Sequence, residues 1–127
     1  MILRVLFIAH AVVTFAAGIV LIVAPALIPS VVGIDLPAEA NLVAYLLGAC
    51  EIGVAVISAL ASRLTDGRAI RAVSLGFIVL HLATAVVEVL AFVQGVDALI
   101  LANVVLRLIV AALFTYFGVY RPRNPGH

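Results

Sequence analysis

The sequence predicts an all-α integral membrane protein, a four-transmembrane-helix bundle that runs up-down-up-down. Of its 127 residues, 67% are hydrophobic and 10% are charged, and the mean hydropathy is +1.40. Soluble globular domains are close to half apolar, so lipid must be the solvent for most of this surface. Four apolar segments also reach the ~20 residues that cross a hydrocarbon core as a helix. We expect one integral membrane domain over residues 1–127.

The first helix is predicted over residues 3–24. Arg4 precedes an apolar stretch that is longer than the core of a signal peptide and has no small-residue cleavage site before Pro25, so we expect it to be retained. Residues 25–37 should not continue a regular helix, because proline and glycine interrupt them. The interrupting residues are Pro25, Pro29, Gly33 and Pro37.

The remaining helices are predicted over residues 40–62, 69–94 and 98–120. A polar turn centred on Asp66-Gly67 joins the second helix to the third, and Asp97 suits the N-cap of the fourth. Such short links turn the chain back on itself, so consecutive helices should run antiparallel.

Arginine placement predicts the orientation of the chain. Six of the seven arginines fall at the N-terminus, in the second link and in the C-terminal tail: Arg4, Arg63, Arg68, Arg71, Arg121 and Arg123. By the positive-inside rule, both termini and the second link should be cytoplasmic, and the acidic residues of the other links should lie on the far side. We therefore expect a multi-pass membrane protein whose two termini are cytoplasmic.

Two features of composition limit the partners. The net charge of +1 gives no reason to expect nucleic acid, and the lone Cys50 permits neither an internal disulfide nor a thiolate cluster. Small residues recur every four positions in the second helix and allow close helix approach, within the bundle or in a homo-oligomer. These pairs are Ala44 and Gly48, Ala49 and Gly53, and Ala55 and Ala59.

Polar residues follow single faces of three predicted helices, as expected for groups that face the bundle interior. They are His10 and Thr14 in the first helix, Ser74, His81, Thr84 and Glu88 in the third, and Asn103, Arg107 and Thr115 in the fourth. At ~1.5 Å per residue from the cytoplasmic helix ends, Glu51, His81 and Arg107 lie about 16–20 Å deep. On the same scale, Glu88 and Asn103 lie at about 25–29 Å, and His10 at about 9 Å.

These residues allow a structural and a functional interpretation. In the first, Arg107 pairs with Glu51 or Glu88 and His81 completes a network that fixes helix register. In the second, Glu51 and His81 exchange protons while Arg107 holds a ligand oxygen. The candidates for acid–base chemistry are then Glu51, His81 and Arg107, and those for ligand contact are His10, Thr14, Thr84, Glu88 and Asn103.

Metal and haem sites are not expected. His10 and His81 differ by ~9 Å of helix rise, whereas the axial ligands of a haem must lie nearly level. The other candidate ligands are spread over several depths, which disfavours a compact metal site. The sequence therefore identifies no cofactor.

Two short motifs carry a resemblance to a known family. Residues 18–25, Gly-Ile-Val-Leu-Ile-Val-Ala-Pro, lead to Gly33, and residues 47–53, Leu-Gly-Ala-Cys-Glu-Ile-Gly, place Glu51 between Gly48 and Gly53. In these motifs the chain resembles the DoxX-like group of small four-helix bacterial membrane proteins. The resemblance implies the same topology, a bacterial inner membrane, a glycine-flanked glutamate, and an association with quinone-linked sulfur oxidation or with partner redox enzymes.

Three functions follow as hypotheses. In the first, a small hydrophobic ligand such as a quinone, an isoprenoid or a sterol-like molecule binds a polar mid-membrane pocket, with acid–base chemistry by the polar residues. In the second, the protein is a proton-coupled transporter of small solutes. In the third, it is an accessory subunit of a larger membrane complex, which the basic tail 121–127 could contact.

Overall fold

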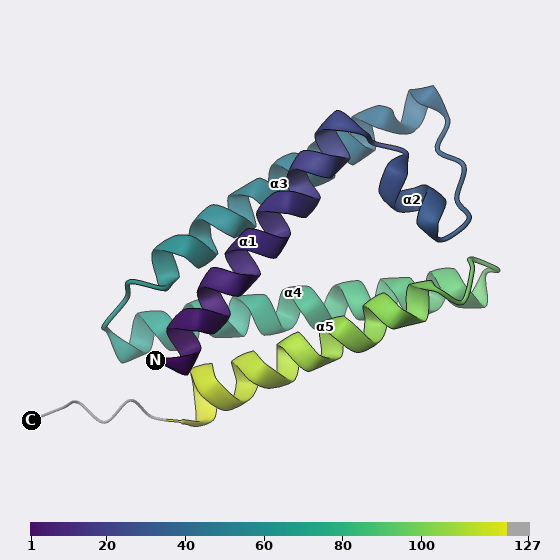
Figure 1. The fold of residues 1–127 in the computed structure, drawn as a ribbon. Coiled ribbons are helices and arrows are strands. Elements are labelled where there is room, and N and C mark those ends of the chain that lie inside the picture. Colours follow the sequence, from purple (N-terminus) through teal and green to yellow (C-terminus); the bar gives the residue numbers. More distant parts are fainter. Residues whose placement is uncertain (122–127) are drawn as a thin grey trace, which may run out of the picture.

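The computed structural model describes residues 1–121, which form helices and short connections without a β-strand (Figure 1). The long helices are α1 (Ile2–Val23), α3 (Asn41–Ala61), α4 (Gly67–Val93) and α5 (Ile100–Phe114), and α5 continues into the π-helix η2 (Thr115–Tyr120). Four spans are long and apolar enough to cross a membrane, with mean hydropathies of 2.0 to 2.6. The predicted all-α fold with four membrane-spanning helices is confirmed. The tail positions after Arg121, including Arg123, lie outside the described residues.

The link after α1 contains helical turns that the sequence analysis did not predict. They are α2 (Leu27–Val31) and the 3₁₀ turn η1 (Ala38–Ala40). Pro29 fits within the first turn of α2, where its missing N–H is not needed for a helical hydrogen bond. Gly33 then ends α2 with φ of 72°, a conformation that favours glycine. The interruption of a regular long helix was therefore predicted, but the short helices were not.

In each of the other two links, an aspartate side chain accepts a hydrogen bond from a backbone N–H. Asp66 is the N-cap of α4, and its carboxylate accepts the Ala69 N–H at 2.8 Å. The helix thus begins at Gly67, in what the sequence suggested was the middle of a turn. Asp97 accepts the Leu99 N–H at 2.8 Å within the turn before α5. The predicted N-cap at Asp97 is therefore wrong, because α5 begins at Ile100 and its N-cap position is Leu99.

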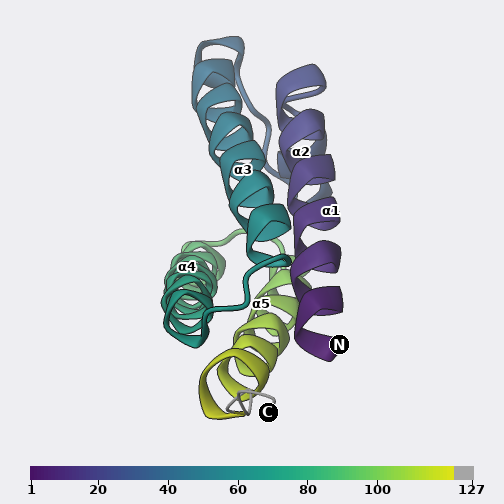
Figure 2. The same ribbon diagram turned by 90° about the vertical axis from the view of Figure 1, so that its left-hand side faces the viewer.

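The four long helices form two antiparallel pairs that converge at one end of the molecule. α1 packs along α3, and α4 packs along α5 (Figure 1). The two pairs meet at the end that holds the N-terminus, the α3–α4 turn and the end of η2, and they diverge toward the end that holds α2 (Figures 1 and 2). We call the converging end the apex. The short turn between α3 and α4 reverses the chain as predicted, but these two helices then lean apart.

Glycines allow the backbones of α1 and α3 to touch. A Cβ atom added to Gly48 would lie 2.8 Å from the Gly18 carbonyl oxygen, and one added to Gly18 would lie 2.7 Å from the Gly48 carbonyl oxygen. The small-residue pair Ala44 and Gly48 is therefore buried inside the fold. Gly53 has no atom within 4 Å of an added Cβ, so the outward pair Ala49 and Gly53 stays available to an oligomer.

Aromatic rings fill the apex. Phe7, Phe77 and Phe114 come from α1, α4 and α5, and their ring centroids are 5.3 to 6.2 Å apart. Phe7 and Phe114 are 1% and 0% exposed, the most completely buried large side chains among the described residues. Edge-to-face and tilted ring packing adds to the burial of these side chains. This cluster joins the two helix pairs.

The Gly18–Gly48 contact makes a testable prediction about stability. Gly48→Leu should force α1 and α3 apart and lower the free energy of unfolding by about 1–3 kcal/mol, the usual cost of overpacking. Gly53→Leu adds the same side chain on an open face of the same helix and is the matched control. Unfolding in detergent followed by circular dichroism would measure both. Equal stability of the two variants would contradict the proposed contact.

Candidate functional site

A directed chain of hydrogen bonds links α1, α3 and α4 near the apex. The Ser58 hydroxyl donates to the Phe7 carbonyl at 2.9 Å, so its oxygen is free to accept the Nδ1–H of His10 at 3.1 Å. The Nε2 atom of His10 lies 3.0 Å from the Nε2 atom of His81. Since neutral His10 already donates through Nδ1, its Nε2 must accept a hydrogen from His81. This assignment leaves Nδ1 of His81 without a hydrogen.

The His10–His81 contact corrects one prediction from the sequence. Counting helix rise from the cytoplasmic ends placed the two rings ~9 Å apart in depth, but the rings touch. The count assumed parallel helices with a common starting level, whereas α4 leans away from α1 (Figure 1). The argument against a bis-histidine haem therefore cannot rest on a difference in depth. Instead, the direct hydrogen bond occupies the space between the two Nε2 atoms.

Apolar side chains surround this histidine pair. Each histidine is 7% exposed, and the His10 ring centroid lies 4.6 Å from that of Phe77 and 5.4 Å from that of Phe114. Nδ1 of His81 is buried and has no hydrogen-bond partner among the described residues. An unfilled acceptor of this kind costs stability unless a donor reaches it. His81 thus retains one nitrogen that can accept a hydrogen bond or a proton.

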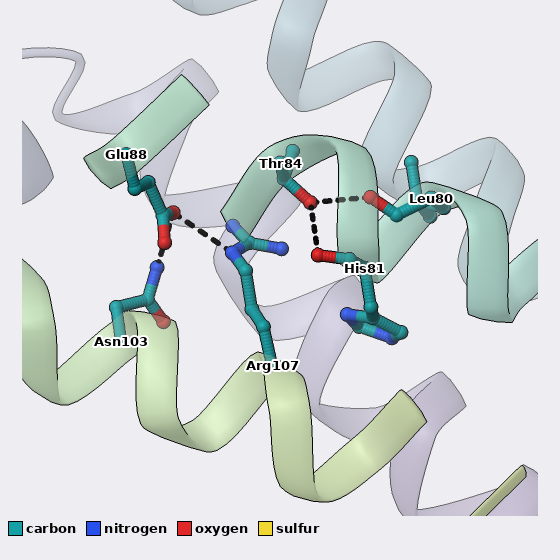
Figure 3. Close-up of polar contacts among 6 residues, drawn as sticks. All are labelled: Leu80, His81, Thr84, Glu88, Asn103 and Arg107. Atoms are coloured by element: carbon teal, nitrogen blue, oxygen red, sulfur yellow. Dashed lines mark hydrogen bonds and ion pairs between the residues drawn. The ribbon is translucent and has the colours of Figure 1, made fainter. Parts of the chain in front are cut away.

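A second polar group lies between α4 and α5 (Figure 3). The Nε–H of Arg107 donates to Oε1 of Glu88 at 2.8 Å, and the side-chain amide of Asn103 donates to the same oxygen at 2.7 Å. The sequence left the partner of Arg107 open between Glu51 and Glu88, and the structure assigns it to Glu88. The periodicity explains this pairing, because Asn103 and Arg107 are one turn apart on the α5 face that packs against α4.

Arg107 uses only a small part of its hydrogen-bonding capacity. A guanidinium carries five N–H donors, and within residues 1–121 only Nε of Arg107 has a partner. The side chain is 21% exposed, so its terminal nitrogens are not sealed inside the protein. Unpaired N–H groups are unfavourable in an apolar medium. The free end of Arg107 can therefore hold an oxygen acceptor that belongs to another molecule.

Glu51 lies on α3, in the other helix pair. It is half-buried and has neither a hydrogen bond nor an ion pair among residues 1–121. The charge of Arg107 nevertheless acts on Glu51 across the space between the helix pairs, and on His81 of the neighbouring α4. The three residues predicted to carry acid–base chemistry therefore share one electrostatic environment without direct contact.

Two predicted ligand contacts already have intrahelical partners. Thr14 donates its hydroxyl to the His10 carbonyl at 2.8 Å, and Thr84 donates to the Leu80 carbonyl at 2.5 Å (Figure 3). Threonine hydroxyls in apolar helices commonly bond to the preceding turn in this way. These two side chains can accept a hydrogen bond from a ligand, but their own hydrogens are engaged.

Two serines matter more than the sequence suggested. Ser58 was not singled out, although a lone hydroxyl seven positions after Glu51 in an apolar helix is a signal for interhelical bonding. Ser74 belongs to the predicted stripe, yet it packs at the apex against Gly118 of η2 rather than near Arg107. Its hydroxyl is fully buried and has no hydrogen-bond partner among the described residues.

The surface hollow found beside α2 does not coincide with this site. No three His, Cys, Asp or Glu side chains are grouped to hold a metal ion within residues 1–121. A hollow of about 530 Å³ lies beside α2 at the diverging end. It is lined by Ala24, Pro25, Ala26, Leu27, Ser30, Leu36, Ala38 and Asn41. None of the predicted site residues lines it.

Comparisons of this chain with models of protein families, with curated proteins and with solved structures give no match. The class of protein is therefore defined by the fold and the polar groups alone. It is a multi-pass membrane protein with two polar clusters between apolar helices.

The bond between Ser58 and His10 makes a second prediction. Ser58→Ala should leave the Nδ1–H of His10 buried without an acceptor and lower the free energy of unfolding by about 1–3 kcal/mol. Ser62→Ala is the control, because the Ser62 hydroxyl bonds only to its own helix, at the Ala59 carbonyl. In a His10→Phe background the Ser58→Ala effect should shrink, since the donor is gone. Additive effects in this double-mutant cycle would contradict the bond.

Proposed function

We propose that this protein binds a small hydrophobic molecule that carries an oxygen acceptor, held between the two helix pairs by Arg107. The single observation that carries the proposal is the free end of the Arg107 guanidinium, which is partly exposed and has no acceptor among residues 1–121. A carbonyl or hydroxyl oxygen on an apolar body would supply that acceptor. Quinones, isoprenoid alcohols and sterol-like molecules have this combination.

Two further features support a ligand that enters from lipid. The helix pairs diverge away from the apex, so the Arg107 side chain stays partly exposed even though α4 and α5 pack closely (Figures 1 and 3). Oε1 of Glu88 accepts from Nε of Arg107 and from the amide of Asn103, so Asn103 steadies the carboxylate that holds Arg107. The terminal nitrogens of Arg107 are left without a partner among residues 1–121. A site preorganised in this way binds with a smaller loss of side-chain entropy.

Glu51 and His81 are the groups that would exchange protons with such a ligand. Both feel the charge of Arg107, and Nδ1 of His81 is an acceptor without a donor among residues 1–121. Membership of the DoxX-like group stays a prediction, and the proposal does not depend on it.

Ligand binding provides a third prediction. Arg107→Leu should lower the affinity for a short-chain quinone in detergent at least tenfold, because a charge-assisted hydrogen bond contributes about 1.5–3 kcal/mol. Arg68→Leu removes an exposed arginine outside the polar clusters and is the control. Quenching of intrinsic tyrosine fluorescence would report binding, and circular dichroism would check the fold. Equal affinity of the Arg107→Leu and wild-type proteins would refute the proposed anchor.

We also propose that the apex faces the cytoplasm of a bacterial inner membrane. The described arginines outside the helix interiors gather at this end and are exposed, whereas the exposed acidic residues of the other links lie at the diverging end (Figure 1). The arginines are Arg4, Arg63, Arg68, Arg71 and Arg121, and the acids are Asp35, Glu39 and Asp97. This distribution follows the positive-inside rule.

A fourth prediction tests this orientation. In a Cys50→Ala background, Ala38→Cys should react with a membrane-impermeant maleimide in intact spheroplasts. Thr65→Cys should react only after the membrane is permeabilised. Both positions are exposed in loops or at a helix start, so accessibility within the fold does not limit either reaction. The reverse labelling pattern would show that the apex faces away from the cytoplasm and would contradict the proposed orientation.

A further inference from the structure

In the middle of the membrane-spanning helices, acidic side chains outnumber basic ones. Two carboxylates, Glu51 and Glu88, lie away from the helix ends, together with one guanidinium, Arg107. Both histidines are engaged with each other, so neither is available as a second cation for these carboxylates. With both carboxylates ionised, this region carries one excess negative charge in an apolar medium, which is strongly unfavourable. One proton or one external cation must accompany them.

The structure identifies the carboxylate that lacks a counter-ion. Arg107 bonds to Glu88 at 2.8 Å, and Asn103 supports the same oxygen. Glu51 has no ion pair or hydrogen bond among residues 1–121. The charge of Arg107 acts on it from a distance, but Arg107 is already paired with Glu88. Glu51 must therefore be neutral unless a cation lies beside it.

A second, independent observation also indicates an absent positively charged or hydrogen-donating group. His81 is 7% exposed, and its buried Nδ1 accepts no hydrogen from any of residues 1–121. In Figure 3 a ring nitrogen of His81 lies on the side of the ring that faces Arg107. The other buried side-chain atom without a partner in this region is also an acceptor, Oε2 of Glu88. A proton or a cation would improve the environment of all these atoms.

We propose that Glu51 is an exchange site at which a lipophilic organic cation, such as a substituted ammonium, replaces a proton. In the exchange, the protonated carboxyl group releases one proton to water, and the resulting carboxylate pairs with the arriving cation, so charge is conserved. The cation we propose is organic rather than a metal ion, since no three His, Cys, Asp or Glu side chains of the described chain are grouped around a common point. Its apolar substituents match the exposed apolar side chains of α3 near Glu51, such as Leu47.

Among residues 1–121, Arg107 of α5 is the charged group that acts on Glu51, and Glu88 of α4 already offsets its charge. The histidines of α1 and α4 bond to each other in the hydrogen-bond chain with Ser58 and do not pair with Glu51. The inference therefore goes beyond the proposed function: it depends on the unpaired Glu51 and not on the free end of Arg107.

Tetraphenylphosphonium binding to the purified full chain in weakly buffered detergent would test the proposal. We expect one proton to be released per cation bound, and the apparent affinity to fall tenfold per pH unit wherever Glu51 is protonated. Glu51→Gln should lower the affinity at least tenfold and abolish proton release, whereas Glu51→Asp should retain both. Cation binding without proton release, or unchanged binding to the Glu51→Gln variant, would overturn the proposal.

Arg107 separates this inference from the proposed function. Arg107→Leu removes positive charge near Glu51, so it should leave the affinity for tetraphenylphosphonium unchanged or raise it, while it weakens quinone binding. A tenfold loss of cation affinity in this variant would overturn the exchange site alone.

If the Glu51→Gln variant does not fold, chemical labelling of the wild-type protein tests the same proposal. Dicyclohexylcarbodiimide modifies protonated carboxyl groups in apolar surroundings, and mass spectrometry would locate the modification. Tetraphenylphosphonium should protect Glu51 from labelling, and unchanged labelling at saturating cation would overturn the proposal.

Discussion

The requirement that polar groups find partners in the absence of water governs this structure. In hydrocarbon, an unpaired hydrogen-bonding group has no solvent to compensate it. Near the apex, the chain from the Phe7 carbonyl to Ser58, His10 and His81 crosses three helices and meets much of the requirement. The Ser74 hydroxyl and Nδ1 of His81 remain without partners among the described residues. Since the aromatic cluster packs against the same rings, the apolar and polar contacts fix one arrangement of the two helix pairs. Away from the apex the requirement is only partly met, and the candidate site lies there.

Much of the fold could be predicted from the sequence because its causes are local. Apolar segments of sufficient length gave the spans, Pro25 follows the end of α1, and Asp66 marks the start of α4. The pairing of helices could not be predicted in the same way. The sequence predicted antiparallel neighbours at every link, but close packing occurs within α1–α3 and within α4–α5, while α3 and α4 lean apart. The Gly18–Gly48 contact is what brings α1 and α3 together. That pairing depends on close backbone approach between segments distant in sequence, for which the periodicity of one helix gives no direct evidence.

The sequence identified most residues of the candidate site but not how they are arranged in space. Ionisable residues in apolar helices indicated His10, His81, Glu88 and Arg107, and the structure joins them in two pairs. Helix rise gave the wrong relative depth for the histidines, because it ignores tilt. It also could not decide between Glu51 and Glu88 as the partner of Arg107, since that depends on which helices diverge.

The divergence of the helix pairs and the imbalance of charge have a common consequence. Arg107 lies in the same pair as Glu88 and can bond to it without any movement of the helices. Glu51 lies in the other pair, so a direct bond to Arg107 would require the pairs to approach each other or Arg107 to leave Glu88. Each alternative exchanges one unpaired group for another, because one guanidinium charge cannot neutralise two carboxylates. The space between the helix pairs is therefore the place where binding a proton, a cation or a ligand oxygen changes the stability of the structure most.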